Sequence, residues 1–455
     1  MRRWTIGIVG GGPGGLLTAY RLEQLSAIPP EITIFEASDR LGGKVRTESF
    51  RCQPVRYEAG AAELYDYSAI DDDPLKDLVA ELGLATVPMG GATAISDGCL
   101  IETVDELAEQ LGPAGHDAYL AFDRQAKAAV SPREFYEATQ AEAAAQAAGQ
   151  ARFSQWLDSL PSAARRYLEQ LMHSDLATEP AATSQRYGLD NYVMNDPAYM
   201  RLYCIAGGND QLIARLASRL TATVRLQHRV TAVGSNPAGH LQLAWQTPTT
   251  SGEQQFDALV LALPVEPLSR LSFRETGLAA SMNRHLTHHD HPGHYLRVSM
   301  LFDQPFWRTW LRDSYCMLDA FGGCCLYDET AREPEATHGV LGWLLGGGAA
   351  QQLAELPDDQ LVALALESLP ATWRPADLQV REARVHRWVG AVSGQPGGFA
   401  TLGLDHRHQP DPAGHPRLLL VGDYLFDSTL NGVLDSADYA AGWLATMMAD
   451  KEQPA

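Results

Sequence analysis

The chain has 455 residues, and its 35 Lys or Arg against 56 Asp or Glu give a formal charge of −21 with neutral histidines. A chain this acidic, without a basic tract, repels nucleic-acid phosphates and anionic membrane surfaces, so neither is an expected partner. With 45% hydrophobic and 20% charged residues the composition is globular, and the length suggests two to three domains. No apolar run approaches the ~20 residues that cross a bilayer. The six cysteines show no CxxC spacing, so we expect a cytoplasmic protein with reduced thiols and no metal site.

The first residues predict a strand, a glycine-rich turn and a helix. The apolar strand Trp4 to Val9 leads into Gly10-Gly11-Gly12-Pro13-Gly14-Gly15, and leucines at helical spacing follow. In such a G-x-G-x-x-G turn Gly10 permits the tight bend, Gly12 lets the backbone approach a pyrophosphate, and Gly15 lets helix and strand pack closely. The N-terminus of the helix, at Pro13 and Gly14, then points at the phosphates.

A second strand supports the same interpretation. Glu31 to Phe35 ends at Glu36, 21 residues beyond Gly15, where a carboxylate accepts the ribose hydroxyls of a dinucleotide. These features alone do not distinguish NAD from FAD.

Two further segments carry a family resemblance. Glu36-Ala37-Ser38-Asp39-Arg40-Leu41-Gly42-Gly43-Lys44-Val45-Arg46-Thr47 resembles the segment after the second strand in the flavin-containing amine oxidase family, which includes L-amino acid oxidases and polyamine oxidases. That family usually has Arg at Lys44, and Lys keeps a cation near the cofactor phosphates. Tyr57-Glu58-Ala59-Gly60-Ala61-Ala62-Glu63 is similar to the family's turn past the flavin ring, which implies cofactor contacts from Gly60, Ala61, Ala62 and Glu63.

The chain later returns to this resemblance. After a helix at Gln211 to Leu220, Val230 matches the family residue whose backbone meets the adenine, and the apolar strand Phe256 to Pro264 follows. The strand Leu418 to Val421 leads to Gly422-Asp423, and the last helix opens at Asn431. The resemblance implies that Asp423 accepts a ribityl hydroxyl, and that Gly432, Val433 and Leu434 begin a helix that faces the N1–C2=O end of the flavin.

The predicted fold is therefore α/β: a discontinuous Rossmann-like FAD-binding domain with an α+β substrate-binding domain. We expect the FAD-binding domain at residues 1–70, 200–280 and 384–455. The substrate-binding domain then comprises 71–199 and 281–383, with a helical insert from Ala118 to Leu157. Its alanine-rich stretch EATQAEAAAQAAGQA consists of good helix formers and predicts a solvated helix.

Arg297 is the candidate catalytic residue. The family usually places a Lys near flavin N5, eight residues before a Pro-Phe-Trp motif, and the residue eight before Pro305-Phe306-Trp307 is Arg297. Arg cannot usefully deprotonate, but its charge would support a reduced anionic flavin or superoxide. The alternative is a structural strand arginine paired with an acid such as Asp303.

Three departures concern the substrate pocket. Where many members have an aromatic cage, Val433 replaces the later aromatic residue, and Trp388 with Gly397-Gly398-Phe399 resembles the earlier segment without a cysteine for covalent flavin. We therefore expect non-covalent FAD and half a cage. Glu63 stands where L-amino acid oxidases commonly have an Arg, and a carboxylate there favours a substrate with a second cationic group. The alternative is a Glu63 bound to the cofactor or to backbone amides. Arg46, Arg56 or Arg297 would still offer a carboxylate clamp, so amino acids stay open.

A histidine-rich stretch suggests metal at first sight. The stretch lies beside Pro292-Gly293 without regular ligand spacing, so we expect a solvated loop. It contains His285, His288, His289, His291 and His294.

The leading hypothesis is an FAD-dependent oxidase that converts the C–N bond of a small amine or L-amino acid to an imine, with O2 accepting the electrons to give H2O2. A desaturase or dehydrogenase acting on a C–C bond would share the Rossmann segments, but such enzymes commonly present apolar membrane-docking surfaces. A third hypothesis is an interaction module with structural FAD, for which the run Asp71-Asp72-Asp73 is too short an argument. Neither the substrate nor the oligomeric state is specified by these motifs.

Overall fold

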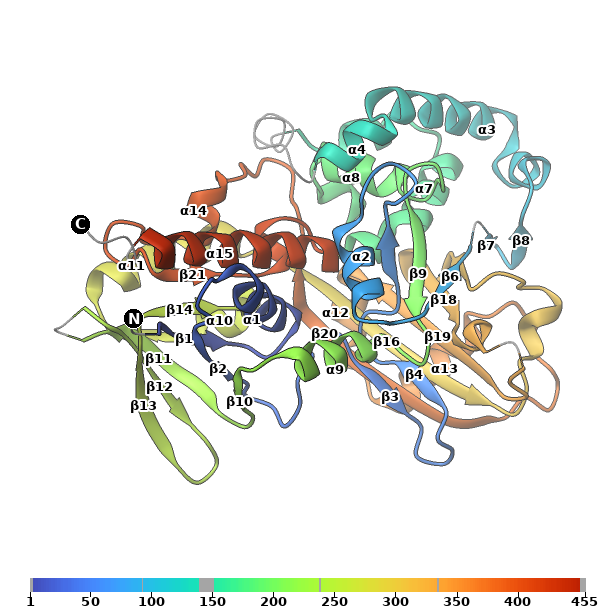
Figure 1. Cartoon of the computed structure of the whole chain (residues 1–455). Helices are drawn as coiled ribbons and strands as arrows, with labels where there is room; N and C mark the ends of the chain where they lie inside the picture. The colour runs from blue at the N-terminus through green and yellow to red at the C-terminus, as the bar shows by residue number, and fades with distance from the viewer. Residues whose placement is uncertain (1–2, 92, 139–150, 237–238, 334, 451–455) are drawn as a thin grey trace.

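A five-stranded parallel sheet organises one half of the molecule (Figure 1). The computed structural model describes residues 3–91, 93–138, 151–236, 239–333 and 335–450. The order of the parallel strands is β10 (Thr223–Arg225), β2 (Glu31–Phe35), β1 (Thr5–Val9), β14 (Ala258–Leu261) and β21 (Leu418–Leu420). The strands β1, β2, β14 and β21 had been expected from the sequence, and the sheet confirms the α/β prediction.

Both faces of this sheet are covered, which explains why its strands are almost wholly apolar. Alternate residues such as Ile8 and Val260 pack with α1 (Pro13–Leu25) and α15 (Leu430–Asp450). Their neighbours, such as Val9 and Leu261, pack with a second, four-stranded sheet. That sheet is ordered β13 (Ser251–Phe256), β12 (Leu241–Gln246), β11 (Arg229–Ser235) and β15 (Ser272–Phe273).

A seven-stranded mixed sheet forms the other half of the molecule, to the right in Figure 1. Its order is β20 (Val380–Ser393), β16 (Pro292–Phe302), β19 (Gly339–Gly346), β18 (Cys324–Asp328), β17 (Tyr315–Leu318), β7 (Ala94–Ser96) and β8 (Cys99–Ile101). One face packs on α13 (Asp358–Glu367) through residues such as Leu326. The other face, with Cys325 and Tyr327, turns toward the helices above it.

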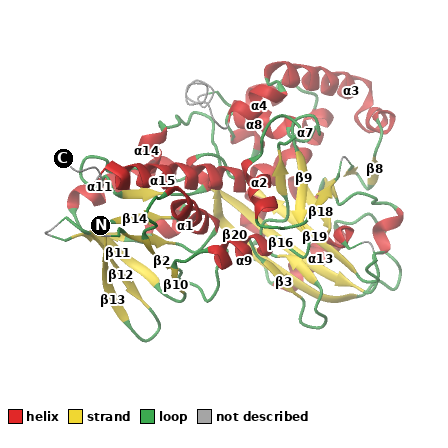
Figure 2. Cartoon of the chain, viewed as in Figure 1, coloured by secondary structure: helices red, strands yellow, loops and turns green. Residues whose placement is uncertain are grey.

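Helices gather above the seven-stranded sheet, as Figure 2 shows in red. They are α3 (Val104–Ala129), α4 (Pro132–Ala138), α6 (Ser154–Leu157), α7 (Ser162–Leu176) and α8 (Gln185–Val193). The helical insert is confirmed where the structure describes it, and most of the alanine-rich stretch, residues 139–150, lies outside the described residues.

Shorter elements join the two halves. The small strands are β3 (Thr47–Ser49) paired with β4 (Arg56–Glu58), and β9 (Arg201–Ile205) between β5 (Leu64–Asp66) and β6 (Thr86–Met89). The remaining helices are α2 (Pro74–Glu81), α9 (Asp210–Arg219), α10 (Val265–Ser269), α11 (Thr276–His289), α12 (Gly347–Leu353) and α14 (Leu404–His408), with short 3-10 turns that include η4 (Glu329–Arg332) and η5 (Asp423–Leu425).

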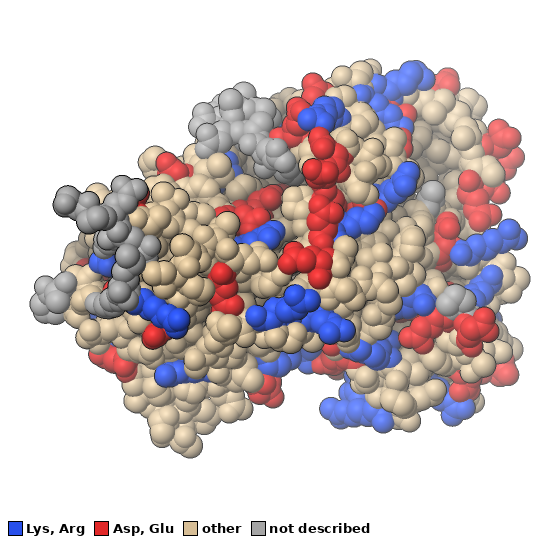
Figure 3. Space-filling model, in the orientation of Figure 1, with Lys and Arg blue, Asp and Glu red and all other residues tan. Residues whose placement is uncertain are grey.

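The domain boundaries stay a prediction, and β20 runs through the proposed division at residue 383. Within the described ranges, no helix combines the length and the apolar character needed to span a bilayer. On the face in Figure 3 basic side chains are scattered among acidic ones. All six cysteines are free thiols.

Candidate functional site

The glycine-rich turn has the geometry of a phosphate cradle. Gly10 has a φ of +107°, and a Cβ there would lie 2.3 Å from the Ala262 carbonyl oxygen. A Cβ at Gly15 would lie 2.0 Å from the Gly10 carbonyl oxygen, so α1 meets β1 too closely for a side chain. Around Gly12 only Gly43 comes within 4 Å of such a Cβ, which leaves the backbone open to a ligand. The residues present therefore fit a bound pyrophosphate.

The entrance to α1 is polar and uncapped. The N-cap residue Gly12 has no side-chain hydrogen bond to the helix, and Pro13 occupies the first turn. The carboxylate of Glu36 accepts the Gly11 amide at 2.8 Å and the Ser38 amide at 2.8 Å, while Ala37 beside it is exposed. The acid expected at the end of β2 is thus held at the rim of the turn.

Lys44 and Asp423 come together although 379 positions separate them in the sequence. The Lys44 ammonium lies 2.5 Å from Oδ2 of Asp423 and 2.7 Å from the Ala391 carbonyl oxygen. Lys44, predicted to lie near the phosphates, and Asp423, predicted to bind the ribityl chain, are therefore direct neighbours. Their cofactor roles stay predictions.

The other predicted cofactor residues lie along the starts of α1, α15 and β11. A Cβ at Gly14 would lie 3.6 Å from Cγ1 of Val433, and a Cβ at Gly432 would lie 2.5 Å from the Asp427 carbonyl oxygen. Leu434 is buried with α1 in the core. Val230 is the second residue of β11 and is followed by a register shift in the pairing with β12, which frees backbone groups for other partners.

The turn from Ala59 to Ala62 is held by side chains of three different elements. The Ala59 carbonyl accepts Trp388 Nε1 at 2.7 Å, and the Gly60 carbonyl accepts Arg297 Nη1 at 3.2 Å. The next two carbonyls, of Ala61 and Ala62, both accept the amide of Asn209 at 3.0 Å. Four successive carbonyls are thus drawn back into the protein. A Cβ at Gly60 would lie 1.9 Å from the Lys44 carbonyl oxygen, so only glycine fits there.

Arg297 is buried in β16 and paired with Glu329, not with Asp303. Its Nη2 lies 2.9 Å from Oε1 of Glu329, and the two side chains are 1% and 2% exposed. Asp303 forms an exposed ion pair with Arg381. The expected partner was wrong because six residues of strand separate Arg297 from Asp303 by roughly 20 Å. The catalytic role of Arg297 stays a prediction.

A cavity of about 460 Å³ opens beside the turn, between β5, β9, β17, β18 and the C-terminal end of α7. Two carboxylates and several tyrosines line its interior: Glu63, Tyr65, Asp175, Tyr315, Cys325 and Tyr327. At one end lie Asp66, its ion-pair partner Lys76, and Arg201, which pairs with Asp66 in the β5–β9 register.

Of the four residues predicted to line the substrate pocket, the cavity contains Glu63. Trp388 holds the neighbouring turn through Ala59, and it faces Tyr295 across the β16–β20 pair. Val433 packs beside Gly14 at the start of α15. Phe399 lies away from them, with its ring centroid 4.6 Å from that of His288 and 4.7 Å from that of His291.

Burial governs the acidity of the two carboxylates. Desolvation raises the pKa of Glu63, while a hydrogen bond from Tyr327 and the charge of Arg297 act against this rise. Desolvation, with a contribution from the Glu63 charge, raises the pKa of Asp175 to about 8. Its carboxylate has a single long hydrogen bond, 3.5 Å from the Ser174 hydroxyl, so a cation entering the cavity would stabilise the ionised form.

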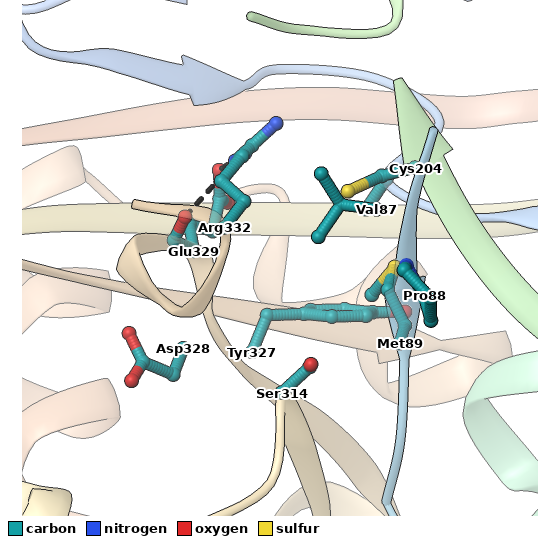
Figure 4. Close-up of a pocket in the computed structure, with 10 residues that line it drawn as sticks. Val87, Pro88, Met89, Cys204, Ser314, Tyr327, Asp328, Glu329 and Arg332 are labelled. Carbon is teal, nitrogen blue, oxygen red and sulfur yellow. Dashed lines mark hydrogen bonds and ion pairs between the residues drawn. The ribbon is translucent and has the colours of Figure 1, made fainter. Parts of the chain in front are cut away.

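Tyr327 also borders a second, much smaller cavity of about 20 Å³, shown in Figure 4. This space has room for about one water molecule, and Ser314, Glu329 and Arg332 are among its lining residues. In Figure 4 the Tyr327 ring extends toward Pro88 and Met89, which border both cavities.

The histidine stretch is not the solvated loop expected from the sequence. His285, His288 and His289 lie on α11, and His294 lies in β16. Positions three and four apart share one helix face, and here that face is covered: His289 is 4% exposed and meets the ring of Tyr424 edge to face. Within the described part of the chain, no group of three or more His, Cys, Asp or Glu could hold a metal ion.

Several cavity residues had been missed. Alternation in β17 and β18, where Tyr315, Met317, Cys325 and Tyr327 face the cavity and their neighbours face the core, was a usable signal of period two. Asp175 at the end of α7, and Glu329 and Arg332 in η4, carried no local signal.

Comparisons with known proteins follow this geometry. The sequence model of the family described as flavin containing amine oxidoreductase matches residues 13–444. The flavin-dependent L-tryptophan oxidase RebO of Lentzea aerocolonigenes is 24% identical over 476 aligned residues, 95% of this chain and 96% of that protein. A coproporphyrinogen III oxidase of Mycobacterium tuberculosis is 44% identical over 78 residues, 17% of this chain and 16% of that protein. The structure of cyclohexylamine oxidase from Brevibacterium oxydans IH-35A has a TM-score of 0.73 at 18% identity, covering 98% of this chain and 100% of the other, a likeness of fold.

Proposed function

Because this chain belongs to the flavin-containing amine oxidoreductase family, whose cofactor is FAD, we propose that it oxidises the C–N bond of a small cationic amine. Bound FAD supplies the acceptor for the two electrons that leave the carbon bearing the nitrogen. The cofactor would be held by the glycine-rich turn and by the side chains of Glu36, Lys44 and Asp423. The absence of cysteine from residues 388–399 supports non-covalent binding. We further propose O2 as the electron acceptor, giving H2O2.

The observation that carries this proposal is the pair of carboxylates in the cavity beside the turn from Ala59 to Ala62, which we propose faces the flavin (the flavin-facing turn). Glu63 and Asp175 both line it, and each has its pKa raised by burial, so a bound ammonium group would relieve an unfavourable arrangement. The tyrosine rings around them offer faces to the same cation.

The residues of the cavity then have separate tasks. A carboxylate of the pair orients the substrate nitrogen and accepts the ammonium proton at its oxygen, which leaves the neutral amine that oxidation requires. The phenol of Tyr327 lines the same cavity, and we propose that it donates a hydrogen bond that fixes the direction of the Glu63 carboxylate. The apolar side chains Met317 and Met89 help to exclude water.

An L-amino acid is the second candidate, because two cations lie beside Asp66 in the lining of the cavity. Lys76 and Arg201 lie there, and they could bind a substrate carboxylate while the ammonium group reaches Glu63 or Asp175. Oxidation of a C–C bond is less well supported, because such a substrate gives the two carboxylates no cation to bind.

A substrate panel tests the proposal. Hydrogen peroxide release would be measured with 1,4-diaminobutane, benzylamine, L-tryptophan and a matched hydrocarbon lacking nitrogen. The proposal predicts turnover of the amines, reduced by Glu63→Gln or Asp175→Asn and unchanged by Asp303→Asn on the exposed strand end. Turnover restricted to L-tryptophan would favour the second candidate, and no turnover of any amine would contradict both.

A further inference from the structure

Glu329 occupies the centre of a buried network of charges under the flavin-facing turn. Its carboxylate accepts Nη2 of Arg297 at 2.9 Å, Nη2 of Arg332 at 2.8 Å, and the backbone N–H of Glu58 at 2.6 Å. Figure 4 shows the contact between Glu329 and Arg332. The side chain of Glu329 is 2% exposed, so no solvent competes for these donors.

The network continues from Glu329 into the turn itself. Nη1 of Arg332 lies 2.8 Å from Oε1 of Glu58, and Nη1 of Arg297 lies 3.2 Å from the Gly60 carbonyl oxygen. The amide N–H of Asn209, whose side chain holds the next two carbonyls, also donates to Glu58 at 3.0 Å. Cations and anions therefore alternate, and each is paired within the protein interior.

Arg297 also lies against Tyr327, a residue that lines the substrate cavity. Its Nε is buried without a hydrogen-bond partner, and its guanidinium carbon lies 5.1 Å from the ring centroid of Tyr327. Tyr327 and Glu63 line the same cavity, and burial together with the nearby charge of Glu63 raises the pKa of the Tyr327 phenol. One guanidinium group thus stands between two carboxylates, Glu329 on the sheet side and Glu63 on the cavity side.

We infer that Glu329 is a positioning residue that holds Arg297 on the Gly60 carbonyl and compensates its charge, so that one buried carboxylate sets both the shape of the flavin-facing turn and the ionisation of Glu63. The first half concerns cofactor binding and is independent of the substrate. The second half rests on the proposed amine oxidation, in which an ionised Glu63 binds the cation.

Groups on every element around Glu63 contribute to its ionisation. Arg297 stabilises the anion, the charge of Glu329 opposes it, and Glu63 in turn raises the pKa of Asp175, where burial is the larger cause. The groups that face it are Tyr65, Asp175, Tyr295, Arg297, Tyr315, Cys325, Tyr327 and Glu329. Among them Glu329 is the acid that contacts Arg297 directly, so its removal changes the field at Glu63 without altering the cavity wall.

Affinity for FAD tests the first half. The dissociation constant of FAD would be measured by titrating apoprotein of the wild type and of Glu329→Gln. A glutamine presents one acceptor oxygen to three donors, so we expect binding weakened by about tenfold or more. Asp303→Asn removes a carboxylate of the same domain that is paired on the surface and is expected to leave the constant unchanged. Equal FAD affinity of folded Glu329→Gln and wild type would overturn this half.

The pH dependence of kcat/KM for 1,4-diaminobutane tests the second half. Activity rises as Glu63 ionises, and an Arg297 released from Glu329 favours the anion more strongly. The acidic limb of the pH profile, where kcat/KM rises with pH, should therefore move to lower pH by about one unit in Glu329→Gln. A general loss of structure would lower activity without this shift. An acidic limb that stays at the same pH or moves to higher pH would overturn the inferred effect of Glu329 on the ionisation of Glu63.

Two further variants keep the inference testable if Glu329→Gln does not fold. In Arg297→Met/Glu329→Gln both buried charges are absent, so folding should be restored while the acidic limb moves to higher pH. Glu329→Asp keeps the charge but cannot reach all three donors, so FAD binding should weaken with the limb unmoved. If the wild type oxidises no amine, the proposed function fails, and FAD affinity alone decides the role of Glu329.

Discussion

Arg297 and Glu329 form a buried ion pair, 2.9 Å between Nη2 and Oε1, that joins β16 to η4 beside the turn from Ala59 to Ala62. The sequence had offered two interpretations of Arg297, a catalytic cation near the flavin and a structural strand arginine paired with an acid such as Asp303. The pairing with Glu329 means that its charge is largely compensated inside the protein. Removal of Glu329 leaves Arg297 buried without this carboxylate partner, whereas removal of Arg297 leaves Glu329 paired with Arg332. Loss of the partner of a buried charge typically costs about 3–5 kcal/mol.

Arg297→Met should slow reoxidation of the reduced flavin by O2 more than it slows flavin reduction. A positive charge beside the cofactor favours electron transfer to oxygen, but Glu329 offsets part of it, so we expect an effect of roughly tenfold. Stopped-flow traces of the two half-reactions measure this directly. An oxidative half-reaction of unchanged rate would leave Arg297 with a structural role.

Glu63→Gln should raise KM for amines that carry a second cation more than KM for simple monoamines. The lost charge-assisted contact is made with bound substrate, so kcat should change less than KM. Steady-state kinetics with 1,4-diaminobutane and butylamine compare the two classes. An equal rise of KM for both amines would show that Glu63 does not contact the second nitrogen.

Asp175→Asn should stabilise the FAD-bound enzyme in mild alkali. Burial raises the pKa of Asp175 to about 8 from an ordinary value of 3.8, so the folded state holds a proton that the unfolded state releases. The free energy of unfolding of the wild type therefore falls as pH rises from the ordinary pKa to the raised one. Asparagine does not titrate, so the variant does not lose this stability. We expect its Tm to exceed that of the wild type by about 2 °C or more at pH 8.

The same comparison at low pH supplies the control. Near pH 4 Asp175 is protonated in the folded state, and the difference in Tm should close. A difference that grows as pH falls would mean that the folded state stabilises the ionised carboxylate, contrary to the burial argument.

Much of the cofactor half of the molecule could be predicted from the sequence, because its signals are local. Gly10 and Gly15 lie in one short turn, and few structures require glycines at that spacing. The apolar runs of β14 and β21 predict a sheet that is covered on both faces. Asp423 could be predicted as a cofactor residue because it comes shortly after the apolar strand β21.

The cavity could not be predicted in the same way, because its residues come from distant elements. Asp175 and Glu63 are brought together by α7 and the turn after β4, and no spacing in the sequence encodes that contact. Asp303 was proposed as a partner of Arg297 because it was near in sequence, whereas the actual partner is 32 residues away in η4. The histidines of α11 were read as a loop because polar residues conceal a helix face that tertiary contacts bury.

His289→Phe should make the protein more resistant to acid. Burial lowers the pKa of His289 to about 2 from 6.5, so the unfolded state binds a proton that the folded state excludes, and stability falls as pH drops below 6.5. Phenylalanine keeps the ring beside Tyr424 and does not titrate. The midpoint of acid unfolding should shift to lower pH, whereas His406→Phe at an exposed position of α14 should leave it in place.

FAD should be released intact when the purified protein is precipitated with acid. The segment from Trp388 to Phe399 contains no cysteine, and the predicted contacts with the cofactor are a glycine cradle and charged side chains. Flavin fluorescence of the supernatant and the washed pellet measures the distribution. Flavin retained in the pellet would contradict non-covalent binding.

Anaerobic mixing of the FAD-bound protein with a cationic amine tests the central claim most directly, since it requires no assumption about the electron acceptor. Flavin absorbance would be followed with 1,4-diaminobutane in wild type, Glu63→Gln and Asp303→Asn. We predict bleaching of the oxidised flavin in the wild type and in Asp303→Asn, at a half-saturating amine concentration about tenfold higher in Glu63→Gln. Oxidised flavin that persists with every amine, while a substrate without nitrogen bleaches it, would contradict oxidation of a C–N bond by this protein.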